Sequence, residues 1–447
     1  MPGPSSSRPT PRKAGKPATA KAIEPKRLDG AALMKARQSA AVTDALALYS
    51  SPSRDLDKMT IDEGLTLAFP DGPAIQTHRK HVFTPKRLAN ILARSLGSDG
   101  VGYALQINKD GTQAATASSG WARNQADGKV AWDTNTRMHI ASVSKFFSCV
   151  ALMRLLTQQG ISFDRKVRDF LPVHWKIGSK AYSLTFDNIM SHRAGLWTSD
   201  SQYGALKREI ETASNVIGES WHYANSNFGL VRILIPIIDG RMKRDVDYGH
   251  VLGFGISNDV AWDVLTRKHF NDFLQEVVWH PSGVSWASLK STKAFWNDPV
   301  LGLIPAIRDA AIGYGYPPVA SDTHGVDISD DLTSTAGADG WHVSCNELLL
   351  AANKIRRLGG IISRRMLNQM FTHGYGLFGR HRNGNVVINF HDGIWSGSGV
   401  SEWAYLGFIG NEYEIAVLTN NARDTPGKPS LGLLRDRVHA AYDQAVA

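Results

Sequence analysis

Ser142 and Lys145 lie three residues apart where the most apolar helical pattern of the chain begins. Residues at this spacing share one face of a helix, one turn apart. A serine hydroxyl needs a neighbouring base to attack a carbonyl, and a lysine can serve when its cationic form is disfavoured. The first turn of a helix disfavours a cation by roughly 0.3–1 kcal/mol, because the helix dipole is positive there. The spacing therefore predicts a serine nucleophile with a lysine base, and the N–H of Ser142 as one oxyanion donor.

The same pattern has a purely structural interpretation, in which Ser142 caps the helix and Lys145 lies on the surface. Two observations favour chemistry. No other S-x-x-K occurs in the chain, and a surface lysine would contribute little to a helix whose apolar stripe runs through Phe146, Phe147 and Val150.

A second candidate element is Tyr223-Ala-Asn225, the single Tyr-x-Asn of the chain. A tyrosinate is a strong base, and a lysine cation lowers the pKa of a neighbouring phenol, so Tyr223 and Lys145 are able to exchange one proton. The amide of Asn225 is suited to orient the lysine and a substrate carbonyl. The competing interpretation is a half-buried tyrosine before a helix that Asn225 caps.

The third candidate element, His391-Asp-Gly393-Ile394, follows a predicted strand and contains the single His-x-Gly of the chain. A glycine would let a substrate lie against the strand edge, and the N–H of Ile394 would be the second oxyanion donor. His391 would hydrogen-bond the substrate or the pair formed by Tyr223 and Lys145. Alone, this segment is equally well an ordinary turn with a histidine.

The elements that must bring these segments together are strands near both ends of the globular part and helices between them. This order predicts an α/β (α+β) fold, with an antiparallel sheet flanked by helices, closed by both chain ends, and an all-helical domain inserted into it. The predicted strands are 101–108, 113–120, 386–390, 403–409 and 414–419, and the predicted helices are 85–96, 142–159, 228–238, 269–278, 345–357, 363–371 and 431–445.

The N-terminal part of the 447-residue chain differs in composition from the rest. Residues 1–28 are rich in Pro, Ser, Ala and Lys, which predicts a disordered basic tail. Residues 29–83 form an N-terminal extension, and the globular domain is expected at 84–447. Within it, the sheet part is expected at about 84–140 and 341–447, and the helical part at about 141–340.

Several function classes are disfavoured by composition. The net charge is +9, much of it in the tail, so we expect solvation of that tail and no nucleic-acid binding. No apolar run is long enough to span a membrane. The start shows no signal peptide, so we expect a cytoplasmic protein, with organelle targeting by the basic N-terminus as the alternative. Cys149 and Cys345 lie in apolar helical patterns and are predicted to be buried free thiols.

Taken together, the three elements resemble the serine β-lactamase and penicillin-binding-protein family in its class C-like branch, which includes esterases, D-amino-acid peptidases and amidases. The hallmarks of that family are S-x-x-K, Y-x-N and K-T-G or H-x-G. The resemblance covers about four-fifths of the chain and extends to the segments 184–196, 336–350 and 416–420.

The resemblance implies a site in the cleft between the helical domain and the sheet. Ser142 would form an acyl-enzyme, Tyr223 would act as general base with Lys145, and water would release the acyl group. Asn225 and His391 would complete the catalytic set, with Gly393 and Ile394 binding the substrate. No metal or cofactor is implied, and the expected partner is a small ester, amide or peptide-like substrate, with the oligomeric state left open.

Departures from the family pattern favour esters or amides over β-lactams as substrates. A histidine replaces the lysine of class C β-lactamases at position 391, and it holds a carboxylate less firmly because it is mostly neutral at pH 7. Asp392 adds a negative charge, expected beside the cleft. Residues 240–264 are an apparent insertion. Trp197, Trp395 and Trp403 are candidates to line the pocket.

Three functions remain open at this point. The favoured one is a carboxylesterase or amidase acting on small acyl substrates. The second is a D-aminoacyl peptidase or β-lactamase. The third, of another class, is a non-catalytic binding protein on the same scaffold.

Overall fold

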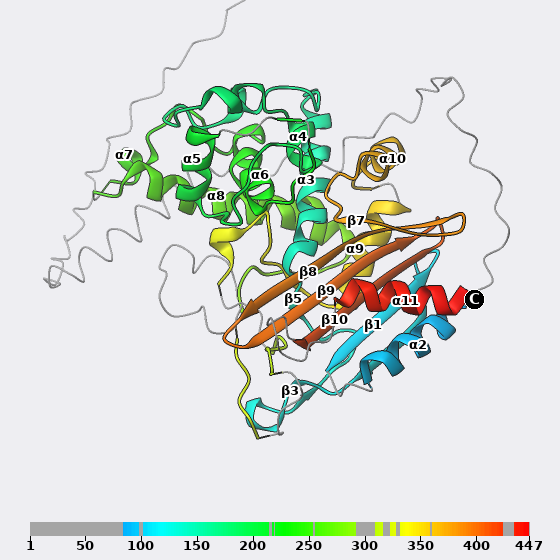
Figure 1. Cartoon of the computed structure of the whole chain (residues 1–447). Coiled ribbons are helices and arrows are strands. Elements are labelled where there is room, and N and C mark those ends of the chain that lie inside the picture. The colour runs from blue at the N-terminus through cyan, green and yellow to red at the C-terminus, as the bar shows by residue number, and fades with distance from the viewer. Residues whose placement is uncertain are drawn as a thin grey trace, which may run out of the picture.

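The computed structural model of the chain describes residues 84–97, 102–213, 217–218, 220–253, 255–291, 309–315, 322–327, 331–357, 360–422 and 433–446. The predicted tail 1–28 and extension 29–83 lie outside these residues. Two layers of helices enclose one sheet, and a group of helices stands at one end of it (Figure 1).

The sheet has six strands in the order β2-β1-β10-β9-β8-β7, and all neighbouring strands are antiparallel. The first strand, β1, therefore lies between β2 and the last strand, β10, so both ends of the domain contribute to one sheet. The strands are β1 (Tyr103–Lys109), β2 (Thr112–Ser119), β7 (Gly379–Asn383), β8 (Val386–Gly397), β9 (Val400–Ile409) and β10 (Tyr413–Ala422).

One face of the sheet is covered by α2 (Pro85–Gly97) and α11 (Leu434–Val446) (Figure 1). Apolar residues of α2 and α11, such as Leu92 and Val438, form one buried cluster with strand residues that include Tyr405. Alternate strand residues, such as Leu406, belong to a second cluster on the opposite face. A sheet whose successive side chains point to opposite faces needs such a layer on each side.

The opposite face packs on α3 (Ser144–Gln158), which carries the S-x-x-K lysine, and on α9 (Cys345–Arg356). Almost every side chain of α3 up to Leu156 is buried, because the helix runs between the sheet and the helical region. A helix that is apolar on all sides occupies such a central position. Cys149 and Cys345 are buried free thiols, as predicted.

The helical region lies between β5 (Met138–His139) and β6 (His342–Val343) in the chain. Residues 240–264, the apparent insertion, contain α7 (Tyr248–Leu252) and the first part of α8 (Asn258–Leu274). The helices of this region, besides α3, are α4 (Phe186–Met190), α5 (Tyr203–Thr212), α6 (Asn225–Ile238), α7 (Tyr248–Leu252) and α8 (Asn258–Leu274), and α10 (Arg364–His373) follows α9.

The predicted fold class is confirmed by this arrangement of an antiparallel sheet, flanking helices and inserted helices. The exact domain limits stay a prediction. Among the described residues, no helix combines the length and the apolar composition needed to traverse a bilayer.

Candidate active site

Ser142 lies in a single 3₁₀ turn, Ala141–Val143, immediately before α3. The preceding residue, Ala141, has a φ of 44°, a conformation that residues with a side chain rarely adopt. Such local strain persists only where the surrounding packing imposes it. Here β8 and α3 enclose the turn, and they leave the Ser142 side chain partly accessible.

The ammonium group of Lys145 is held by three oxygen atoms from three different parts of the chain. Its Nζ lies 2.9 Å from Ser142 Oγ, 2.8 Å from Asn225 Oδ1 and 2.7 Å from the carbonyl oxygen of Ala338. The lysine side chain is fully buried. The predicted meeting of Ser142, Lys145 and Asn225 is therefore present in the structure, and the alternative of a surface lysine is not.

Burial lowers the pKa of Lys145 to about 7, even though the nearby Asp339 carboxylate raises it. Burial raises the pKa of Asp339 itself to about 6, with Lys145 and a hydrogen bond from Thr335 acting in the opposite direction. Desolvation penalises the charged form of both groups. Near neutral pH a substantial fraction of Lys145 is therefore an uncharged amine. Sequence reasoning did not single out Asp339.

Tyr223 faces the same hydroxyl from the other side. Its phenol is hydrogen-bonded to Ser142, and Lys145 Nζ lies 5.0 Å from the centre of its ring. Burial raises the pKa of Tyr223 well above its ordinary value, and the bond to Ser142 offsets this only in part. The sequence predicted that Lys145 lowers this pKa, but the pKa is raised, because burial penalises the charged phenolate. Tyr223 is therefore a protonated phenol.

His192 packs against Tyr223, with ring centroids 4.6 Å apart and planes inclined by 30°. Its Nδ1 faces the side-chain amide of Asn227 at 3.1 Å. Burial, with Lys145 and His391 nearby, keeps the pKa of His192 well below its usual value. This neutral ring fixes the position of Tyr223. His192 belongs to the 184–196 segment that resembles the family, but the residue pattern alone gave it no role.

His391 lies on β8, almost fully buried, with its ring centroid 6.1 Å from that of Tyr223. Its Nδ1 donates to the carbonyl oxygen of Asp392 at 2.6 Å, and its buried Nε2 has no hydrogen-bond partner among the described residues. Burial and the charge of Lys145 lower its pKa to about 3. His391 therefore offers a neutral acceptor nitrogen beside the tyrosine.

Gly393 brings β8 against the serine turn. A Cβ atom at this position would lie 2.3 Å from the carbonyl oxygen of Ile140 and 2.9 Å from the backbone nitrogen of Ser142. β7 pairs with β8 only as far as Phe390, so this edge of β8 beyond it faces the serine turn. The glycine therefore makes room for the backbone of that turn. The expected substrate beside Gly393 stays a prediction. Ile394 follows on the same strand.

Asp392 does not place a free negative charge beside the cleft, contrary to expectation. Successive strand residues point to opposite faces, and Asp392 Oδ2 accepts from Arg435 on α11 at 2.9 Å. Trp403 is a core residue, with 1% of its surface exposed. Trp197 is largely exposed and stacks on His222, with 3.9 Å between the ring centroids.

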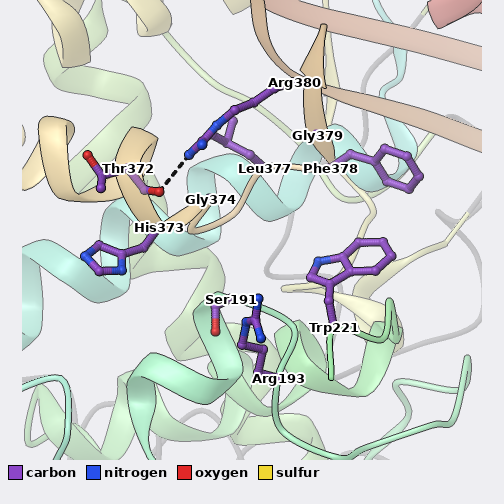
Figure 2. Close-up of a pocket in the computed structure, with 10 residues that line it drawn as sticks. All are labelled: Ser191, Arg193, Trp221, Thr372, His373, Gly374, Leu377, Phe378, Gly379 and Arg380. Carbon is purple, nitrogen blue, oxygen red and sulfur yellow. Dashed lines mark hydrogen bonds between the residues drawn. The ribbon is translucent and has the colours of Figure 1, made fainter. Parts of the chain in front are cut away.

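A cavity of about 370 Å³ lies next to this cluster (Figure 2). Its walls come from the segment after α4, the residue two positions before Tyr223, and the connection from α10 to β7. None of the predicted catalytic residues lines it. Its lining residues are Ser191, Arg193, Trp221, Thr372, His373, Gly374, Leu377, Phe378, Gly379 and Arg380.

Comparison with other sequences points to one family. Residues 88–247 match the model of the Beta-lactamase family. A D-aminopeptidase of Cereibacter sphaeroides is 26% identical over 170 residues, which are 34% of this chain and 31% of that protein. An uncharacterized protein of Alkalihalophilus pseudofirmus is 25% identical over 173 residues, 38% of this chain and 47% of that protein. The chain thus matches less than half the length of either relative.

Solved structures extend the similarity over most of the chain. A D-amino acid amidase from Ochrobactrum anthropi has a TM-score of 0.55 and 17% identity, and the alignment covers 80% of this chain and 99% of the amidase. A penicillin-binding protein homologue from Pyrococcus abyssi has a TM-score of 0.52 and 18% identity, over 76% of this chain and 74% of the homologue. At these identities the similarity concerns the fold. Residues 88–247 therefore match the Beta-lactamase family model, and the chain has the fold of the β-lactamases and penicillin-binding proteins, consistent with their class C-like branch.

Proposed function

We propose that the protein is a serine hydrolase that forms an acyl-enzyme on Ser142, and that it acts as a carboxylesterase or amidase on small acyl substrates. The observation that carries this proposal is the 2.9 Å contact between Lys145 Nζ and Ser142 Oγ, made by a buried lysine whose pKa is lowered to about 7. A nucleophile with a base in hydrogen-bond reach is the central requirement of covalent catalysis.

The three contacts of Lys145 suit a neutral amine. An uncharged amine keeps two hydrogens and one lone pair. It can donate to Asn225 Oδ1 and the carbonyl of Ala338, and accept the proton of Ser142 along the remaining 2.9 Å contact. We therefore assign the first proton transfer to Lys145. The raised pKa of Tyr223 makes a resting phenolate unfavourable, so we propose Tyr223 as a proton donor, in place of the role of general base with Lys145 that the resemblance implied.

The reaction then proceeds in two steps. Ser142 Oγ bonds to the acyl carbon while its proton passes to Lys145. The bond from that carbon to the leaving oxygen or nitrogen breaks, and the phenol of Tyr223 gives its proton to the leaving group and recovers one from Lys145. Water then attacks the acyl carbon in the place of the leaving group, and its proton passes through Tyr223 to Lys145. The bond from the acyl carbon to Ser142 Oγ breaks, Lys145 returns the proton to Ser142, and the acid is released. The N–H groups of Ser142 and Ile394 are the proposed oxyanion donors.

The test is labelling with a fluorophosphonate probe followed by mass spectrometry of the modified peptide. We expect one label on Ser142, lost in Ser142→Ala and retained in Ser199→Ala, whose hydroxyl lies on an exposed loop near Asn225. Correctly folded protein that takes up no label, and that hydrolyses no ester or amide, would leave the non-catalytic binding function as the better interpretation.

The alternative activity is that of a D-aminoacyl peptidase or β-lactamase. It is favoured by the D-aminopeptidase and the D-amino acid amidase among the similar proteins. It is disfavoured by the neutral His391 at the third element, which provides no cation for a substrate carboxylate at that position. Turnover of nitrocefin or of a D-amino acid amide at a rate matching that of a simple nitrophenyl ester would favour the alternative.

A further inference from the structure

The cavity beside Tyr223 carries positive charge on its walls. Of its ten lining residues, two are arginines, Arg193 and Arg380, and none is acidic. Arg380 donates to the carbonyl oxygens of Phe371 and Thr372 and to Asn389 Oδ1, all of which are neutral. These bonds fix the guanidinium without cancelling its charge.

Arg193 contributes the second guanidinium from the opposite wall (Figure 2). Its side chain is exposed, and it forms no ion pair with another residue in the part of the chain that the structure describes. An arginine presents several N–H donors in a planar fork that matches a carboxylate. Two such groups around one cavity provide a site for an anion.

The cavity shares an aromatic wall with the catalytic cluster. Trp221 and Phe378 line it, with ring centroids 6.0 Å apart. Phe378 also lies 5.4 Å from the Tyr223 ring and 6.1 Å from the His391 ring. A molecule whose carbonyl is at Ser142 and whose other end is in the cavity would pass these aromatic rings.

We propose that this cavity binds the carboxylate of the substrate, so that the preferred substrates are esters or amides with a carboxylate several bonds from the scissile carbonyl. This inference rests on the proposed hydrolase function. In the family pattern, a lysine of the third element binds the substrate carboxylate, and this chain has His391 there. We infer that Arg193 and Arg380 bind the carboxylate instead. The aromatic wall suits an apolar spacer between carbonyl and carboxylate.

The test compares pairs of substrates that differ only in that charge. One pair is the para-nitrophenyl monoester of adipic acid and its methyl-capped diester, with the carboxylate on the acyl side. The other is the acetate ester of para-hydroxyphenylacetic acid and its methyl ester, with the carboxylate on the leaving side. We expect kcat/KM of the wild-type protein to be higher for the acid than for its methyl ester in at least one pair, and the preference to shrink as salt screens the site.

Variants then locate the preference. Arg193→Gln should reduce the acid-to-ester ratio by about tenfold, as expected for loss of one charge-assisted contact, and Arg193→Glu should invert the preference. Arg380→Gln should act in the same direction. Arg94→Gln removes an equal charge from an exposed position on α2, across the sheet from α3, and should leave the ratio unchanged.

Failure of this inference is distinguishable from failure of the hydrolase proposal. Hydrolysis of the methyl esters with no preference for the acids, or a preference that Arg193→Glu does not alter, would overturn carboxylate recognition and leave the hydrolase proposal standing. If neither ester is cleaved, calorimetric titration with monomethyl adipate decides. Binding that Arg193→Glu abolishes supports the cavity as an anion site, and no binding to the wild-type protein overturns it.

Discussion

Replacing Asp339 with asparagine removes the carboxylate that favours the charged form of Lys145. The amide keeps an oxygen that can accept the hydrogen bond from Thr335, so the loop geometry should survive. An opposite charge within a few ångströms typically shifts a pKa by about 1–3 units. Because Asp339 is itself partly protonated, with a pKa of about 6, we take the lower end of that range. The pKa of Lys145 should therefore fall from about 7 to about 6.

The consequence is measurable as a pH profile of kcat/KM for a neutral para-nitrophenyl ester. With a pKa of about 7, the neutral amine is roughly a tenth of the population at pH 6, and with a pKa of about 6 it is roughly half. Asp339→Asn should therefore be up to about fivefold faster than wild type at pH 6 and equal to it at pH 9. The matched control is Asp443→Asn on α11, whose carboxylate pairs with His381 far from Lys145.

Three results would refute this reasoning. If the acid limb of the kcat/KM profile lies at the same pH in Asp339→Asn as in the wild-type protein, Asp339 does not set the charge of Lys145. An acid limb that moves to higher pH would mean that the base is not a lysine stabilised as a cation by this carboxylate. A uniform loss at every pH, with the limb unmoved, would reduce Asp339 to a structural residue.

Three further perturbations test other parts of the site. Tyr223→Phe should lower kcat/KM by about 10²–10⁴-fold, because the proton donor to the leaving group is lost; stopped assays that find a near-normal rate would remove Tyr223 from the mechanism. Gly393→Ala should cost about 1–3 kcal/mol of unfolding free energy in urea titrations and slow the labelling of Ser142, because the new Cβ meets the serine turn. The control Gly97→Ala has open space around the new Cβ and should have neither effect. Burial lowers the pKa of His269 to about 4, so the unfolded state takes up protons first as the pH falls, and the stability that this group contributes above about pH 6.5 is lost towards pH 4. Because burial also lowers the pKa of other histidines, including His391, the test is a difference: between pH 7 and pH 5, His269→Gln should lose about 2 kcal/mol less unfolding free energy in urea titrations than the wild-type protein does.

The sheet was largely predictable from sequence, because its strands alternate between two apolar layers. The predicted strands 101–108 and 414–419 correspond to β1 and β10, and the predicted helix 142–159 corresponds to α3 with its preceding turn. β7 was missed, because Gly379–Asn383 is a polar edge strand with no buried side chain and therefore no apolar pattern. Tertiary pairing with β8 creates this strand.

The members of the site were predictable because each hallmark triplet occurs once, but their charge states were not. A pKa depends on burial, and burial of Lys145 and Tyr223 follows from the packing of segments about eighty residues apart. The side on which Asp392 points depends on strand register, which pairs it with Arg435. The cavity between Arg193 and Arg380 has no local sequence signal at all, because its walls come from three separate segments.

The surroundings of Lys145 differ from those of the buried arginines in this chain, and the difference supports the proposed role of Lys145 as a base. Arg232 is fully buried and lies 2.8 Å from the Asp263 carboxylate, and the nearly buried Arg356 lies 3.0 Å from that of Glu414. Each arginine thereby stays charged, since direct contact with a carboxylate offsets much of the desolvation cost. Lys145 is equally buried, but the three oxygens in hydrogen-bond contact with it belong to a hydroxyl, an amide and a peptide group. Neutral acceptors hold an amine in place without compelling it to keep its proton, which is the condition that a base at neutral pH requires.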